Sequence, residues 1–185
     1  MRLTLSAAPA DAAPTPPQAS GTSQSSAVVP IKGQLLDFRT TCCAAHGLSL
    51  LLVAKTLNED GSEVEHCCLF DAGPQPDTFA ANVKKLSVDL ASIEQIVLSH
   101  YHADHSSGLR SAVPLIAEAR KAAKLPPPTV DLHPDCPECR GLKFPTGKIG
   151  TIQPPDPTFE ELTSLGGTVV ASNKAHSICD GSFFV

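Results

Sequence analysis

Three histidines and one aspartate lie within six consecutive residues of the stretch SHYHADHSSGL, residues 99–109. The whole chain has seven histidines, so three of them stand in this one segment. Side chains alternate along an extended chain, so we expect His100, His102 and Asp104 to project to one side. His105 can face a second position if the backbone curls there. Imidazole and carboxylate groups at this density are typical of a site for divalent metal ions.

The ligand types suit Zn²⁺, and also Mn²⁺ or Fe²⁺. The spacing allows two ions, one held by His100 and His102 and the other by Asp104 and His105. Two ions about 3.5–4 Å apart can clamp a hydroxide between them and polarise a substrate oxygen. The alternative is a solvated polar loop with chance histidines. The position of the cluster directly after an apolar strand favours the metal site.

The elements that must position this cluster alternate between strand and helix patterns, which predicts an α/β fold. Apolar runs at residues 47–57 and 64–73, separated by the turn signal NEDG, predict a β-hairpin. A helix is predicted at residues 76–88, and a short buried strand at 95–100 leads into the cluster. The other predicted elements are strands at 33–38, 129–134, 167–172 and 181–185, and helices at 107–124 and 159–165.

Composition divides the chain of 185 residues into a tail and one domain. Residues 1–28 are rich in Ala, Pro and Ser, and they predict a disordered tail because they cannot bury enough apolar surface. Residues 29–185 are long enough to bury a core and are predicted to form one domain. The last residues, SFFV, have the pattern of a strand, and a complete domain would usually avoid an unpaired edge there. We therefore expect the domain to be C-terminally incomplete.

Charge and hydropathy limit the partners of the chain. The formal net charge is −5 and no basic run is present, which argues against nucleic-acid binding and membrane-surface binding. No stretch has the length of a membrane-spanning helix. Without a secretory signal, a reducing cytoplasmic location is expected for the seven cysteines. A transit peptide is the alternative, although Arg2 is the only early basic residue. We expect a small-molecule substrate, and self-association through an exposed sheet edge.

The residues HYHADH, 100–105, resemble the H-x-H-x-D-H signature of the metallo-β-lactamase superfamily. The stretches AAHGLSLLL, LFDAG and VDLHPD are similar to a subgroup related to dihydropterin–ribofuranosyl-aminobenzene-phosphate synthase-like proteins. The resemblance implies an αββα sandwich, first half only in this chain, with a dinuclear metal site between two sheets.

The resemblance also implies roles for individual residues. His100 and His102 would bind the first zinc ion, and Asp104 and His105 the second. Asp104 would also orient the attacking water. Asp71 would support the motif loop from outside the ligand shell, since ligand histidines need an acceptor for their other nitrogen. A simple strand-end turn is the alternative for Asp71.

The superfamily pattern requires three later ligands. The histidines after the motif, His133 and His176, stand in segments that resemble strands or their approaches. Two ligands per ion fall short of the three usual in catalytic zinc sites, so we expect impaired activity in this truncated chain. The C-x-x-C spacing at Cys136–Cys139 is interpreted as accidental, and His46 and His66 as packing or surface residues.

The predicted function is a metal-dependent hydrolase that directs a metal-bound hydroxide at an ester, amide or phosphate-type bond. A non-catalytic metal-binding or regulatory fragment is one alternative. A pterin-related transferase is the other.

Overall fold

A computed structural model describes residues 41–58, 60–153 and 155–185, which fall within a unit spanning Asp37–Val185. The predicted tail at residues 1–28 and the predicted strand at 33–38 lie outside the described residues.

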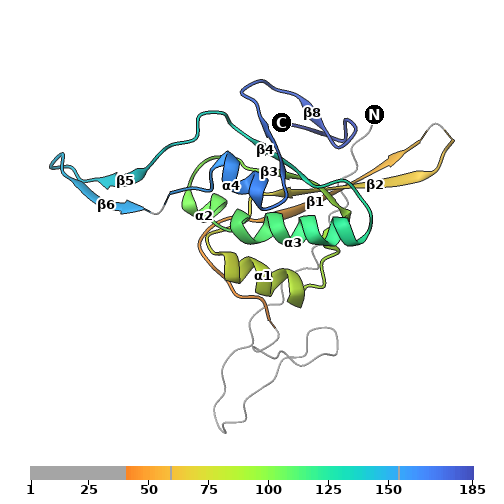
Figure 1. The fold of residues 1–185 in the computed structure, drawn as a ribbon, viewed down its shortest axis with the longest axis horizontal. Helices are drawn as coiled ribbons and strands as arrows, with labels where there is room; N and C mark the ends of the chain where they lie inside the picture. Colours follow the sequence, from red (N-terminus) through yellow and green to blue (C-terminus); the bar gives the residue numbers. More distant parts are fainter. Residues whose placement is uncertain (1–40, 59, 154) are drawn as a thin grey trace, which may run out of the picture. The chain divides into compact units, whose positions relative to one another are not determined.

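The described residues form a five-stranded sheet with the strand order β1-β2-β3-β4-β7 (Figure 1). Strand β1 (Leu50–Leu57) pairs antiparallel with β2 (Glu63–Phe70), which is the predicted hairpin. Strand β2 runs parallel to β3 (Ile93–Val97), β3 to β4 (Thr129–Leu132), and β4 to β7 (Thr168–Ala171). Parallel strands joined by helical crossovers are the α/β class that the alternating pattern predicts.

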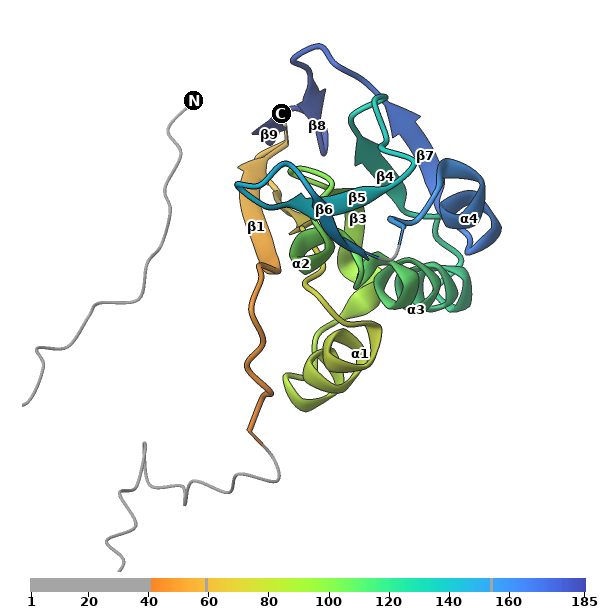
Figure 2. The same ribbon diagram turned by 90° about the vertical axis from the view of Figure 1, so that its left-hand side faces the viewer.

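Three helices lie on one face of the sheet: α1 (Pro76–Lys85), α3 (Leu109–Ala122) and α4 (Phe159–Ser164) (Figure 2). Helix α1 begins with its proline, whose fixed φ suits the first helical position. Helix α3 continues through Pro114 at the cost of one backbone hydrogen bond. Within the described part of the chain, no helix combines the length and apolar character needed to cross a bilayer.

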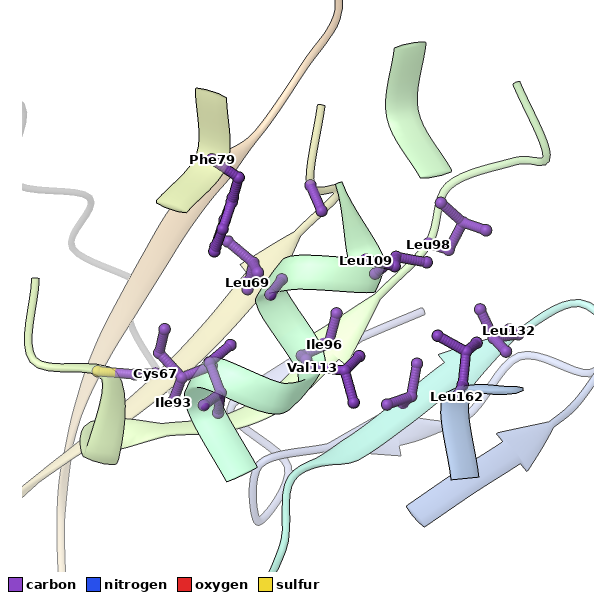
Figure 3. Packing of buried hydrophobic residues seen from close by; sticks show 14 of the residues in the cluster. Cys67, Leu69, Phe79, Ile93, Ile96, Leu98, Leu109, Val113, Leu132 and Leu162 are labelled. Carbon is purple, nitrogen blue, oxygen red and sulfur yellow. The ribbon is translucent and has the colours of Figure 1, made fainter. Parts of the chain in front are cut away.

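The core lies between the helices and the sheet (Figure 3). Ile93 and Ile96 of β3 pack in one cluster with Leu109 and Ile116 of α3 and with Leu132 of β4, each at most 1% exposed. Full burial of such side chains stabilises the fold by about 1.5–3 kcal/mol each. Strand β3, which leads into the motif, is therefore anchored in the core.

The opposite face of the sheet carries a small ribbon made of β8 (Ser177–Ile178) and β9 (Phe183–Phe184). Ile178 packs there in a cluster with Cys68 and Val97 of the sheet. The last residues of the sequence, predicted as a strand, thus pair with β8.

One prediction for the middle of the chain is wrong. The sequence suggests only a loop after β4, but β5 (Arg140–Lys143) and β6 (Ile149–Gln153) form an antiparallel hairpin. Its turn is closed by the Phe144 N–H, which donates to the Lys148 carbonyl at 2.9 Å. Strands this short, between Pro- and Gly-containing segments, carry too few apolar positions for a period of two to be recognised. A 3-10 turn, η1 (Leu90–Ser92), also precedes β3 without a sequence prediction.

Candidate metal centre

The histidine motif begins where β3 ends, at the carboxyl edge of the parallel strands, where α/β folds place ligand sites. The prediction that the motif is extended from His100 to Asp104 is wrong. The chain bends at His100 and Tyr101, and then enters the short helix α2 (Ala103–Ser106) with His102 as its N-cap residue. The His102 carbonyl accepts hydrogen bonds from two backbone N–H groups of α2, both at 2.9 Å. The carboxylate and the third imidazole therefore stand on a helical turn.

Asp71 lies at the end of β2 and is fully buried, with 0% exposure. Its carboxylate accepts three hydrogen bonds of 2.7 Å, from the Ser99 N–H, the Ser99 hydroxyl and Nδ1–H of His105. Its φ of 59° is left-handed, a conformation that Asp adopts more readily than most residues. This carboxylate thus ties the end of β2 to both the start of the motif loop and helix α2.

The hydrogen bonds fix which imidazole nitrogens carry protons. The Ser99 hydroxyl gives its hydrogen to Asp71, so its oxygen accepts one from Nδ1–H of His100 at 2.9 Å. With Nδ1 protonated in both His100 and His105, the Nε2 atoms carry the lone pairs that can bind a metal. Partial desolvation, followed by the neighbouring His105 and His102, lowers the pKa of His100 below its ordinary value. Both effects favour a neutral imidazole ready to act as a ligand.

The imidazole rings of the motif gather closely. The ring centroid of His100 lies 4.4 Å from that of His102 and 4.3 Å from that of His105. Oδ2 of Asp104 lies 3.6 Å from Nε2 of His105. As the side chains stand, no group of three or more His, Cys, Asp or Glu among the described residues is arranged to hold a metal ion. The donor types fit zinc, with two imidazoles already oriented through Nδ1, and rotations of the remaining side chains would have to bring them onto one ion.

A buried ion pair lies beside helix α2. Asp156 is 4% exposed and accepts a hydrogen bond of 2.6 Å from Nη2 of Arg140. Its carboxylate also contacts the Ser106 hydroxyl, whose oxygen lies 3.0 Å from the carbonyl oxygen of His102. The ion pair therefore joins the root of the β5–β6 hairpin to the motif helix. Sequence reasoning missed these residues, because a single Arg and a single Asp in a proline-rich stretch have no diagnostic spacing.

Two backbone segments approach the motif region so closely that only glycine fits. A Cβ atom on Gly47 would lie 2.0 Å from the carbonyl oxygen of Asp104, and one on Gly108 would lie 1.9 Å from that of Ala72. Gly47 also has a φ of 138°. The Leu48 N–H donates to the same Asp104 carbonyl at 3.3 Å. Main chain thus packs directly on main chain around α2.

A hollow of about 890 Å³ opens beside the motif, and its lining includes His46, His102, Asp104, Cys139 and Arg140. The His46 side chain is 96% exposed, and its Nε2 lies 3.5 Å from Oδ2 of Asp104. It is a surface residue, as interpreted from the sequence, but one that faces the motif carboxylate. Only the fold brings these two distant positions together, so no local spacing could have shown it.

Other histidines have partners elsewhere. Nδ1 of His133 accepts a hydrogen bond from the backbone N–H two residues later. His66 is buried and lies 3.2 Å from Glu94. His176 donates from Nε2 to Asp131 at 2.7 Å and from Nδ1 to a backbone carbonyl at 2.9 Å. Both contacts favour the protonated imidazole, and first the carbonyl and then Asp131 raise the pKa of His176 above its ordinary value.

The family model of the metallo-beta-lactamase superfamily matches residues 62–172, more than half of the chain. The matched region contains Asp71 and the complete histidine motif. The chain therefore belongs to the metallo-beta-lactamase superfamily.

Several solved structures are similar to this chain. A long form RNase Z from yeast is 24% identical, with 45% of this chain and 11% of that chain covered and a TM-score of 0.39. MEM-A1, a subclass B3 metallo-beta-lactamase from a soil metagenome library, is 18% identical. The match covers 73% of this chain and 47% of MEM-A1, with a TM-score of 0.34. The chain thus spans less than two thirds of either structure. No curated protein sequence matches it.

Proposed function

We propose that this chain carries a metal-dependent hydrolase site in which His100, His102, Asp104 and His105 hold one or two zinc ions. The observation that carries the proposal is the hydrogen-bond network around Asp71. It leaves the lone pair on Nε2 of His100 and His105 free to bind a metal ion. Such oriented imidazoles are what metal ligation requires. Membership of a superfamily that is typically hydrolytic supports the same chemistry.

A bound zinc ion would supply a Lewis acid for an ester, amide or phosphate-type bond. Asp104 lines the hollow, where its carboxylate could accept a hydrogen bond from the attacking water. Asp71 holds the proton on Nδ1 of His105 and so keeps Nε2 available. A small-molecule substrate would enter the hollow, and the resemblance to the dihydropterin-related subgroup keeps a transfer reaction open as a variant.

A non-catalytic metal-binding or regulatory module is the second candidate. One observation favours it: no three His, Cys, Asp or Glu side chains among the described residues are arranged to hold a metal ion. On this alternative, metal binding would be weak and turnover would not depend on the motif.

The two candidates separate in one experiment. The purified chain is loaded with zinc, its metal content is measured by inductively coupled plasma mass spectrometry, and hydrolysis of p-nitrophenyl acetate, bis-p-nitrophenyl phosphate and nitrocefin is followed. We expect bound zinc and turnover that the variants His102→Ala and Asp104→Asn abolish. His133→Ala, which removes an exposed imidazole outside the motif, is the matched control. Weakly bound zinc without motif-dependent turnover would select the non-catalytic module.

A further inference from the structure

Among the described residues, the four motif groups would supply only two ligands to each of two ions. If His100 and His102 hold one ion, Asp104 and His105 supply only two donors to the other. Catalytic zinc sites usually have three protein ligands and one open position. A further donor near Asp104 would close that gap.

His46 has the right atom in the right place. Its Nε2 lies 3.5 Å from Oδ2 of Asp104, and Nε2 of His105 lies 3.6 Å from the same oxygen. Two ligand atoms at about 2.0–2.1 Å from a tetrahedral zinc ion are about 3.4 Å apart. Each spacing to Oδ2 is close to that between neighbouring ligands of one ion, but the three side chains as they stand do not yet form a metal site. The His105 nitrogen is also the one left free by its hydrogen bond to Asp71.

The backbone holds His46 at this place. Gly47 packs so closely against the Asp104 carbonyl that a Cβ atom on residue 47 would clash with it. The Leu48 N–H donates to the same carbonyl oxygen. The His46 side chain itself is 96% exposed toward the hollow, so it can rotate without disturbing the core.

The geometry points to His46 as a third protein ligand, through Nε2, of a zinc ion shared with Asp104 and His105. The inference rests on the proposed metal site and deepens it. Rotation of the exposed His46 ring would bring its Nε2 toward an ion held by Asp104 and His105. The ligands of such a site would be two imidazoles and one carboxylate.

Metal binding itself tests the assignment. The full chain is stripped with a chelator and titrated with Zn²⁺ in competition with a chromophoric chelator, and Co²⁺ is then used to record the d–d absorption of the site. We expect His46→Ala and His46→Gln to lower the affinity of one bound ion by at least roughly 100-fold, because losing a direct ligand should cost more than losing a residue that only orients one, which costs about 10–100-fold. The Co²⁺ absorption of that ion should change as well. His133→Ala should bind as the parent chain does.

The outcomes separate this assignment from the proposed function. If the parent chain binds zinc and both His46 variants match it in stoichiometry, affinity and Co²⁺ spectrum, the His46 assignment is wrong and the motif site stands. If the parent chain binds no zinc, both are wrong. Circular dichroism confirms that each variant is folded, as expected for substitution of so exposed a side chain.

Discussion

The carboxylate of Asp71 is the best place to test how the fold prepares the motif. Asp71→Asn keeps the shape of the side chain, and Asn also tolerates the left-handed φ of 59°. The amide oxygen can still accept from the Ser99 N–H. The amide nitrogen, however, is a donor, and it would face the Ser99 hydroxyl and Nδ1–H of His105.

The magnitude follows from the three contacts. Hydrogen bonds to a charged group contribute about 1.5–3 kcal/mol each, and neutral ones about 0.5–1.5 kcal/mol. Losing two of the charged kind and weakening the third costs about 5 kcal/mol. Relief of the buried charge offsets part of this. We expect the free energy of unfolding of the metal-free chain to fall by about 3 kcal/mol, roughly a factor of 100 in the folding equilibrium.

The same substitution should weaken zinc binding. Facing an amide N–H, the imidazole of His105 is driven to the other tautomer, so that Nε2 carries the proton and loses its lone pair. Loss of such an orienting partner typically costs about 10–100-fold in metal affinity. Urea denaturation gives the stability and chelator competition gives the affinity. Asp77→Asn, which neutralises an exposed carboxylate in the first turn of α1, is the control and should cost less than about 1 kcal/mol. An Asp71→Asn chain within about 1 kcal/mol of the parent, with unchanged zinc affinity, would refute the reasoning.

Three further predictions concern the surroundings of the motif. Gly108→Ala should lower the unfolding free energy in urea by about 1–3 kcal/mol, because its Cβ would meet a carbonyl oxygen at 1.9 Å. Arg140→Met should cost about 3–5 kcal/mol by the same assay, because it leaves Asp156 buried without its cation, and adding Asp156→Leu should recover most of that loss. His176→Gln should destabilise the chain at acidic pH but little at alkaline pH. The pKa of His176 is raised in the folded chain, so its pairing with Asp131 stabilises fully below the ordinary value of 6.5 and is lost as pH rises through the raised value. Thermal melts at pH about 5.5 and about 9 would measure the difference in melting temperature between the parent chain and His176→Gln. A larger difference at pH about 9 than at pH about 5.5 would contradict the prediction.

The fold class followed from local patterns alone. The hairpin of β1 and β2, the helix beginning at Pro76 and the strand before the motif all carry long apolar runs or helix-start signals, and all are found. The β5–β6 hairpin was not predicted because its short strands carry no recognisable alternation of apolar and polar residues in the sequence. The cytoplasmic location and self-association stay predictions.

The part of the candidate site that consists of neighbouring residues in the sequence could be predicted. The four motif groups stand within six positions, and Asp71 follows a strand. The curl of the chain at Ala103 depends on backbone hydrogen bonds that residue types do not reveal. His46 and Asp156 reach the motif from distant parts of the sequence, so only the folded arrangement could assign them there.

Gly47 and Gly108 leave no room for a side chain, whereas most residues that line the hollow carry side chains. Around α2, peptide groups meet with no side chain between them, so mutation has almost no latitude there. The rim of the hollow is different, because residues 139–141 come from a hairpin that projects away from the sheet (Figure 1). Substitutions in the hairpin rim should therefore alter the entrance to the hollow, whereas a side chain at residue 47 or 108 would displace the main chain that positions the motif helix.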